Sequence, residues 1–173
     1  MKKTILTFGL ISGVLSSLMM VSTVPFIDNV GFDRGELVGY TAIVLSFLLV
    51  YFGVRSYREN VGGGAISFGR GLTVGILITL ISCAFYVGTW EVIYFKVMPD
   101  FGTKLANSMV AKAKAEGASA DALVAAEKEA ADFKVMYDKP LVNMAMTFVE
   151  PFPIGVLVTL VSATALRRNK ASA

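Results

Sequence analysis

Four long apolar runs constrain this chain more than any other feature of its sequence. Each run can cross a hydrocarbon core as a helix, which takes about 20 residues at a rise of about 1.5 Å per residue. Backbone N–H and C=O groups find no partners in lipid, so an uninterrupted run of this length is expected to be helical. The sequence therefore predicts an all-α integral membrane four-helix bundle. It would form a single membrane domain over residues 1–173, with spans over about 5–24, 37–54, 71–95 and 141–166.

The composition agrees with a bilayer as the solvent and excludes several kinds of chemistry. Hydrophobic residues make up 55% of the chain and its mean hydropathy is +0.66, above the range of ordinary soluble domains. The chain contains no His, which excludes imidazole bases, His-based triads and imidazole metal sites. The basic start and the first apolar run resemble a signal peptide. However, the run is longer than a usual h-region and no A-x-A-like site follows Met20, so we interpret it as the first span.

The distribution of basic residues predicts the orientation of the spans. One side carries basic residues in short segments with a single acidic residue, Glu59, among them. The other side carries as many basic residues, but these are spread over two longer loops rich in acidic residues. Because short basic segments stay in the cytoplasm, we predict that both termini are cytoplasmic. The basic residues on this side are Lys2, Lys3, Arg55, Arg58, Arg70, Arg167, Arg168 and Lys170.

The stretch VGGGAISFGRG, which starts at Val61, contains the G-x-x-x-x-G spacing of a phosphate-binding loop in Gly64 and Gly69. Such a loop needs a Lys and then a Ser or Thr directly after the second glycine, and it joins a strand to a helix. Here Arg70 and Gly71 follow, and both flanking segments are predicted spans. We therefore interpret the stretch as a cytoplasmic bend and predict no nucleotide partner. Candidate contacts to lipid headgroups near this bend are Arg55, Arg58 and Arg70.

Residues 96–140 separate the third and fourth spans and are predicted to form an extracytoplasmic amphipathic helical hairpin. Apolar residues recur there at steps of three and four, Gly117 can end the first helix, and Ser119 can cap the second. The hairpin either packs on itself and on the membrane mouth, which we favour, or docks an exported partner. The two apolar stripes are Phe101, Leu105, Met109 and Ala113, and Leu123, Ala126, Ala130, Phe133 and Tyr137.

Small residues form stripes along all four spans, which allows helices to approach closely in lipid. The stripes can pack the spans within one chain, or they can form a homodimer face, for which the G-x-x-x-G of the first span is the best candidate. The stripes alone do not choose between these two arrangements. The glycines predicted to mediate helix packing are Gly9, Gly13, Gly71, Gly75 and Gly155.

Three carboxylates form a candidate cluster near the outer boundary of the membrane. Counting the helical rise from the cytoplasmic basic residues places Glu36, Glu91 and Glu150 near the outer boundary, at levels within about one helical turn. Together they could gather protons or a hard divalent cation. Alternatively, each carboxylate marks the outer interface beside an aromatic belt. We favour this interpretation because an ionisable group costs much less free energy at a helix end than in the middle of the bilayer. Pro151 and Pro153 follow Glu150 and are predicted to break or kink the fourth span there.

Three segments carry a resemblance to a known family. They read LLVYFGVRSYRENVGGGAISFGRGLTVGILITLISCAFYVGTWEV, MPDF and GVLVTLVSATALRRNK. The chain resembles, over nearly its whole length, the small bacterial membrane proteins catalogued as domain of unknown function 4199. This resemblance implies a multi-pass protein with four helices in the bacterial inner membrane. It implies no activity, cofactor or catalytic residue.

Two classes of function remain for the chain. The first is a non-enzymatic structural or interaction protein, whose partners are membrane lipids and either further copies of the chain or another membrane protein. The second is an ion or small-solute conduit that uses the outer carboxylates. An enzyme ranks below both because no nucleophile with a base and no metal-binding pattern is evident, so we predict no catalytic residue, no metal and no cofactor. Nothing in the sequence indicates nucleic-acid binding.

Overall fold

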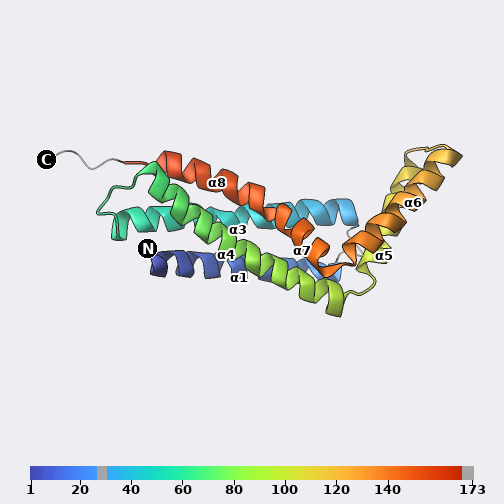
Figure 1. The fold of residues 1–173 in the computed structure, drawn as a ribbon, viewed down its shortest axis with the longest axis horizontal. Coiled ribbons are helices and arrows are strands. Elements are labelled where there is room, and N and C mark those ends of the chain that lie inside the picture. The colour runs from blue at the N-terminus through green and yellow to red at the C-terminus, as the bar shows by residue number, and fades with distance from the viewer. Residues whose placement is uncertain (27–30, 169–173) are drawn as a thin grey trace.

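The computed structural model describes residues 1–26 and 31–168, which form helices joined by short links (Figure 1). Lys170 of the orientation argument lies outside these residues. The secondary structure of the described residues is helical apart from one isolated antiparallel bridge between Ile66 and Arg168. The elements are α1 (Lys2–Thr23), η1 (Val24–Phe26), α3 (Phe32–Asn60), α4 (Phe68–Val92), η2 (Ile93–Val97), α5 (Phe101–Ala115), α6 (Ala120–Tyr137), α7 (Pro140–Val149) and α8 (Pro151–Leu166).

Within residues 1–26 and 31–168, four helices are long and apolar enough to cross a membrane, which confirms the all-α prediction with four spans. They are Lys2–Thr23, Arg34–Asn60, Phe68–Val97 and Pro140–Leu166, the last combining α7 and α8. Helices α3 and α4 both contact α1 on one side and α8 on the other. The start of α1 and the end of α8 lie at one end of the spans, which we call the terminal end (Figure 1). The helices α5 and α6 project from the opposite end, which we call the hairpin end.

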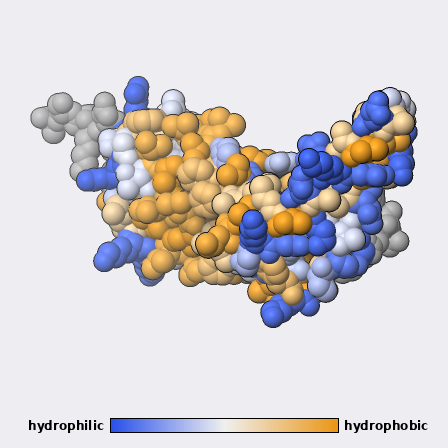
Figure 2. Space-filling model, turned by 45° about the vertical axis from the view of Figure 1, so that its right-hand side comes forward, coloured by the Kyte–Doolittle hydropathy of each residue, from blue (hydrophilic) through white to orange (hydrophobic). Residues whose placement is uncertain are grey.

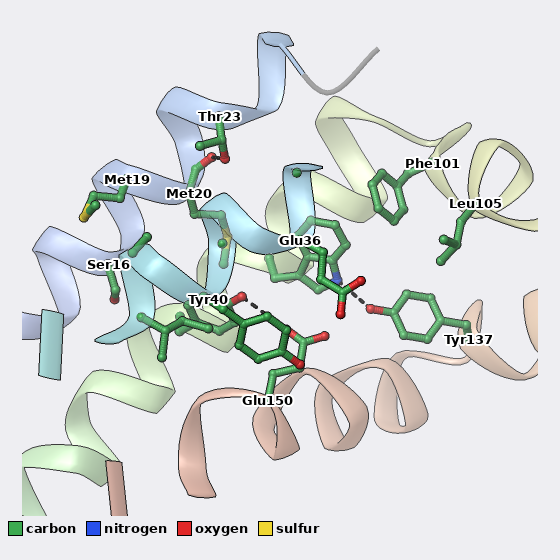
Figure 3. A pocket seen from close by; sticks show the side chains of 16 residues that line it. Ser16, Met19, Met20, Thr23, Glu36, Tyr40, Phe101, Leu105, Tyr137 and Glu150 are labelled. Atoms are coloured by element: carbon green, nitrogen blue, oxygen red, sulfur yellow. Dashed lines mark hydrogen bonds between the residues drawn. The ribbon is translucent and has the colours of Figure 1, made fainter. Parts of the chain in front are cut away.

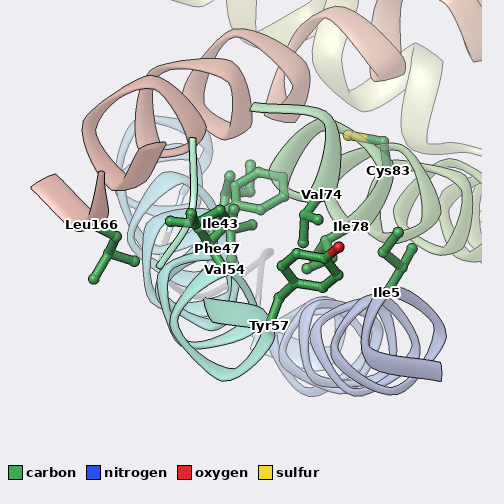
Figure 4. Packing of buried hydrophobic residues seen from close by; sticks show 11 residues of the cluster. Ile5, Ile43, Phe47, Val54, Tyr57, Val74, Ile78, Cys83 and Leu166 are labelled. Atoms are coloured by element: carbon green, nitrogen blue, oxygen red, sulfur yellow. The ribbon is translucent and has the colours of Figure 1, made fainter. Parts of the chain in front are cut away.

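The outer surface of the spans is apolar, as expected for contact with lipid tails. Figure 2 shows a hydrophobic belt between a polar terminal end and the polar hairpin. Large side chains such as Leu18, Leu37 and Leu157 are more than half exposed on this surface. The interior combines a hydrophobic cluster, shown in Figure 4, with buried hydroxyl groups. These hydroxyls bond between helices: Ser12 Oγ donates to the carbonyl oxygen of Ser46 at 2.9 Å and lies 3.0 Å from Ser82 Oγ.

Glycine stripes bring the spans into close contact within the chain. A Cβ atom at Gly9 would lie 2.9 Å from Ile81 Cβ, and one at Gly13 would lie 2.8 Å from Phe85 Cβ, so both glycines accommodate side chains of α4. Gly71, Gly75 and Gly155 do the same between α4 and α8. The G-x-x-x-G motif of the first span is therefore occupied by α4, which corrects its assignment as the best candidate for a homodimer face.

The glycine-rich link between α3 and α4 is a bend at the terminal end. Gly63 and Gly64 have φ values of 64° and 84°, a region that glycine adopts without a Cβ penalty. At the C-terminal end of α3, the Gly64 N–H of the link donates to the carbonyl oxygen of Arg58 at 2.9 Å. Ser67 Oγ then caps α4 by accepting from the Arg70 N–H at 3.4 Å. The G-x-x-x-x-G spacing thus runs from the link into the first turn of α4 and does not follow a strand.

Helices α5 and α6 form a hairpin with the expected start and stop signals. Gly117 has a φ of 76°, and Ser119 Oγ accepts from the Ala122 N–H at 3.3 Å at the start of α6. The two helices pack against each other along their length. The two-helix prediction for residues 96–140 is therefore confirmed, while the position of the hairpin outside the cytoplasm stays a prediction.

Candidate functional site

A cavity of about 260 Å³ lies at the hairpin end, where the spans meet the base of the hairpin (Figure 3). The last turns of α1, the first turns of α3 and the later part of α4 form its walls. The start of α5, the end of α6 and the junction of α7 with α8 complete it. The lining residues are Ser16, Met19, Met20, Thr23, Gly35, Glu36, Gly39, Tyr40, Ala42, Ile43, Tyr86, Trp90, Phe101, Leu105, Tyr137 and Glu150.

Helical periodicity explains why these residues line one space. On α3, Glu36, Gly39, Tyr40 and Ile43 recur at steps of three and four, so they share one face. The same spacing relates Ser16, Met19, Met20 and Thr23 on α1, and Tyr86 and Trp90 on α4. A Cβ atom built at Gly39 would meet no atom within 4 Å, so the cavity is open in front of this residue.

Glu150 enters the cavity because the fourth span is broken at that residue. Helix α7 ends at Val149 and α8 begins at Pro151, with Glu150 between them. Pro151 and Pro153 lack the backbone N–H that would continue the helical ladder, which explains the break predicted at this position. The Glu150 side chain is held by Tyr86, whose hydroxyl donates to Glu150 Oε2 at 3.2 Å. The helix break therefore presents a carboxylate to the cavity.

A hydrogen-bonded network fixes the hairpin wall of the cavity. Trp90 Nε1 donates to the Tyr137 hydroxyl at 3.0 Å, and that hydroxyl lies 3.5 Å from Thr147 Oγ1. Thr147 in turn donates to Asn143 Oδ1 at 3.3 Å, and Asn143 Nδ2 donates to the carbonyl oxygen of Tyr137 at 3.2 Å. Burial raises the pKa of the Tyr137 phenol, so its hydroxyl remains protonated at neutral pH. The network joins α4, α6 and α7 at the cavity.

A second contact ties the hairpin to the spans at Asp138. Lys134 Nζ donates to Asp138 Oδ2 at 2.6 Å, and the Tyr94 hydroxyl donates to Asp138 Oδ1 at 2.5 Å. These two hydrogen bonds, first that from Lys134 and then that from Tyr94, lower the pKa of the Asp138 carboxyl below its usual value. The end of α6 is therefore anchored to the end of the third span.

The three predicted carboxylates do not line a single space. Glu36 and Glu150 line the cavity together, with Tyr40 among the other lining residues. Glu91 lines a separate groove between α4 and α7, with Gly88 and Leu141 among its neighbours. The Glu91 Oε1 atom is buried and has no hydrogen-bond partner within the described part of the chain. The structure thus brings together two of the three residues.

The predicted headgroup contacts lie at the terminal end, away from the cavity. Arg55 Nε and Arg58 Nη2 both contact Glu59 Oε1, at 3.0 and 3.1 Å. Arg70 is exposed in the first turn of α4. Among residues 1–26 and 31–168, no group of three or more His, Cys, Asp or Glu side chains is arranged to hold a metal ion. Lipid contact by the three arginines stays a prediction.

Comparison with known protein families identifies the family of this chain. The family described as Protein of unknown function (DUF4199) matches residues 7–168. The chain belongs to this family. No curated protein and no solved structure matches it significantly. Because the DUF4199 match runs from before Ser16 to beyond Glu150, it includes every residue that lines the cavity.

Sequence reasoning missed most of the aromatic wall of this DUF4199 cavity. The hydropathy pattern predicts no role for Tyr40 or Tyr86, and helical periodicity places Phe101 and Tyr137 only in the packing stripes of the hairpin. A signal was available, because Glu36 and Tyr40 on α3, like Tyr86 and Trp90 on α4, are four residues apart. Each pair places polar or aromatic groups on one face near the end of a span.

Proposed function

We propose that the protein is a non-enzymatic interaction protein of the bacterial inner membrane, and that it binds a small ligand in the cavity at its outer, hairpin end. The observation that carries the proposal is the cavity itself, which five helices and the junction of α7 with α8 build from widely separated parts of the chain. Ligand pockets are concave, largely apolar spaces with a few placed polar groups, and they occur between the helices of membrane and soluble proteins. Two carboxylates among aromatic and thioether side chains fit that description.

The connection between cavity and hairpin supports an interaction role. Tyr137 and Phe101 belong to the hairpin, line the cavity and pack in one buried cluster with Tyr94. A ligand in the cavity therefore contacts the spans and the hairpin at once, and stabilises their junction. The predicted orientation would place this junction on the extracytoplasmic side of the membrane.

Thermal unfolding in a non-ionic maltoside detergent tests the proposal. We expect some members of a chemically diverse set of small anions, cations and neutral compounds to raise the Tm of the purified protein. A ligand present at about 100 times its Kd stabilises the folded state by about 2.7 kcal/mol. For a chain of this size, that corresponds to a Tm increase of about 5–11 °C.

Two glycine variants provide the control. Gly39→Phe fills the open space in front of α3, and should abolish the response. Gly69→Phe puts the same ring at the terminal end, where a Cβ atom also meets nothing within 4 Å, and should preserve it. The proposal fails if no class of compound raises the Tm, or if Gly39→Phe responds like the unaltered protein.

A conduit is the second candidate, and the break at Glu150 favours it. Broken helices and intramembrane carboxylates are features of transport pathways. Below the cavity, however, the void beside Ser46, Ser82 and Tyr86 is too small to hold a water molecule. A conduit would therefore require the spans to separate there. Liposome flux that saturates and is lost in Glu150→Gln would establish this function, whereas flux equal to that of protein-free liposomes would eliminate it.

A further inference from the structure

We propose that the cavity at the hairpin end binds an organic ammonium cation, which Glu36 and Glu150 hold by charge against the surrounding aromatic rings. This assignment rests on the proposed function, because it requires that the cavity holds a small ligand. It adds the chemical class of that ligand.

Aromatic rings form much of the cavity wall. The Trp90 and Phe101 rings meet edge to face, with centroids 4.9 Å apart and an interplanar angle of 85°, so the wall has differently oriented ring surfaces. A cation within about 6 Å of such ring centroids is attracted to their negative faces, and quaternary ammonium groups are typically held by cages of several rings. The five rings are Tyr40, Tyr86, Trp90, Phe101 and Tyr137, from α3, α4, α5 and α6.

The charges around the cavity favour a cation and oppose an anion. The side chains of Glu36, Tyr40 and Glu150 line the same cavity (Figure 3). None of the described lining residues is Lys or Arg. Two neighbouring carboxylates repel each other, and a cation between them relieves that repulsion. An anionic ligand would add to it.

The hydrogen-bonding groups of the cavity wall also favour an ammonium ligand. The Tyr86 hydroxyl already donates to Glu150, and the Trp90 N–H already donates to Tyr137. Ionised carboxylates are acceptors only. The strongest groups left to a ligand are therefore carboxylate oxygens and ring faces, which complement N–H or N-methyl groups.

Size and ligand number distinguish an organic cation from a metal ion. The volume of about 260 Å³ is just below the range of about 300–1,000 Å³ that is typical for ligand pockets, so it fits a small organic molecule. Calcium takes six to eight oxygen ligands. The cavity supplies two carboxylates in a mainly apolar wall, and no cluster of three metal-binding side chains occurs among the described residues.

Trp90 makes a direct test possible, because it is the only Trp in the chain and lines the cavity. Purified protein in maltoside detergent, which has no ammonium group, is titrated with choline and with benzyltrimethylammonium while Trp fluorescence is recorded. The control ligand is the neutral isostere of choline, in which carbon replaces the quaternary nitrogen. We expect a saturable fluorescence change with both ammonium compounds and a response to the isostere that is at least about tenfold weaker, equivalent to about 1.4 kcal/mol.

Variants locate the binding site. Tyr40→Leu removes one ring and should weaken choline binding by about two- to thirtyfold, the range given by cation–π energies of about 0.5–2 kcal/mol. The double change Glu36→Gln and Glu150→Gln should abolish the saturable response. Glu91→Gln removes a carboxylate outside the cavity and should leave the response unchanged. Circular dichroism and gel filtration confirm that each variant is folded before it is compared.

A parallel titration with a short-chain phosphatidylcholine distinguishes a lipid headgroup from a free ammonium compound as the ligand. Tighter binding of the lipid than of choline assigns a headgroup, the reverse assigns a free compound, and both results support the ammonium chemistry. The proposal is refuted if the neutral isostere binds as well as choline, if the folded double variant binds choline normally, or if no ammonium compound gives a saturable response. If an anionic or neutral compound raises the Tm in a Gly39-dependent way, ligand binding stands and the ammonium assignment fails.

Discussion

The contact between α4 and α8 at Gly75 makes a quantitative prediction about stability. A Cβ atom at this position would lie 2.5 Å from Thr159 Cγ2 and 2.9 Å from Thr159 Oγ1, whereas unstrained heavy atoms pack at about 3.5–4.0 Å. In Gly75→Ala, Thr159 must therefore move by about 1 Å or rotate. Either movement disturbs the buried contact of 3.3 Å between Thr79 Oγ1 and Thr159 Oγ1.

The magnitude follows from three terms. Overpacking costs about 1–3 kcal/mol, and loss of the hydroxyl contact costs about 0.5–1.5 kcal/mol. Replacing a helical glycine with alanine returns about 0.5–1 kcal/mol. We therefore expect Gly75→Ala to destabilise the protein by about 0.5–4 kcal/mol, a Tm decrease of about 1–16 °C for a chain of this size.

Gly88→Ala is the matched control because Gly88 lies on the same helix, where a Cβ atom meets nothing within 4 Å. It should be neutral or slightly stabilising. Thermal unfolding in maltoside detergent, measured for both variants at the same protein concentration, gives the comparison. If Gly75→Ala is as stable as Gly88→Ala, then α4 and α8 do not pack as closely as the structure indicates, and the argument from this contact is wrong.

Two further predictions concern orientation and the hairpin anchor. The predicted orientation places the bend in the cytoplasm and the hairpin outside it. In a Cys83→Ser background, Asn60→Cys should therefore resist an impermeant thiol reagent added to intact spheroplasts, whereas Lys128→Cys should react. The opposite labelling pattern would reverse the orientation. Because the folded-state pKa of Asp138 is lowered, its contribution to stability is present above its unfolded pKa of about 4 and is lost as the pH falls through the lower folded value. Asp138→Asn should therefore lower the Tm at neutral pH and reduce the loss of Tm on acidification, and an unchanged pH profile would show that the anchor contributes no stability.

The spans could be predicted from sequence because lipid imposes one strong condition on the backbone. A run of about 20 apolar residues has no alternative to a helix, so all four spans were found. Their ends were less accurate: α3 runs over Phe32–Asn60, whereas the apolar run covers residues 37–54. Polar residues such as Arg55 and Glu59 continue the helix beyond the apolar run because their backbone ladder does not depend on lipid. The hairpin was predictable for a different reason, since Gly117 and Ser119 are local stop and start signals that do not depend on tertiary contacts.

The carboxylate cluster shows what depth alone cannot predict. The helical rise gives the level of a residue in the membrane, but each residue also turns the side chain by about 100° around the axis. Tyr86 and Trp90 share the face of α4 that lines the cavity, and Glu91 follows Trp90 by one residue, so it points to another face. That face includes Gly88, three residues earlier, and it lines the groove against α7. Glu91 was predicted in the cluster because it lies at the same membrane level as Glu36 and Glu150. It lies outside the cavity because its side chain points to a different face of α4.

The break at Glu150 has the opposite effect, because it frees that residue from the phase of a continuous helix. A regular span through residues 140–166 would fix the direction of every side chain by its place in the turn. Proline at 151 and 153 interrupts the ladder, and the Tyr86 hydroxyl then holds the Glu150 carboxylate at the cavity. Glu36 reaches the same space from the first turns of α3. Its level near the membrane boundary follows from its position in α3 alone, without knowledge of the neighbouring spans. The pairing of these two carboxylates is thus a tertiary property, because it depends on which faces of α3 and α4 turn toward the break. The sequence contains the residues of the cavity, and only the packing of the spans determines that Tyr40 and Trp90 stand on the same side as the two charges.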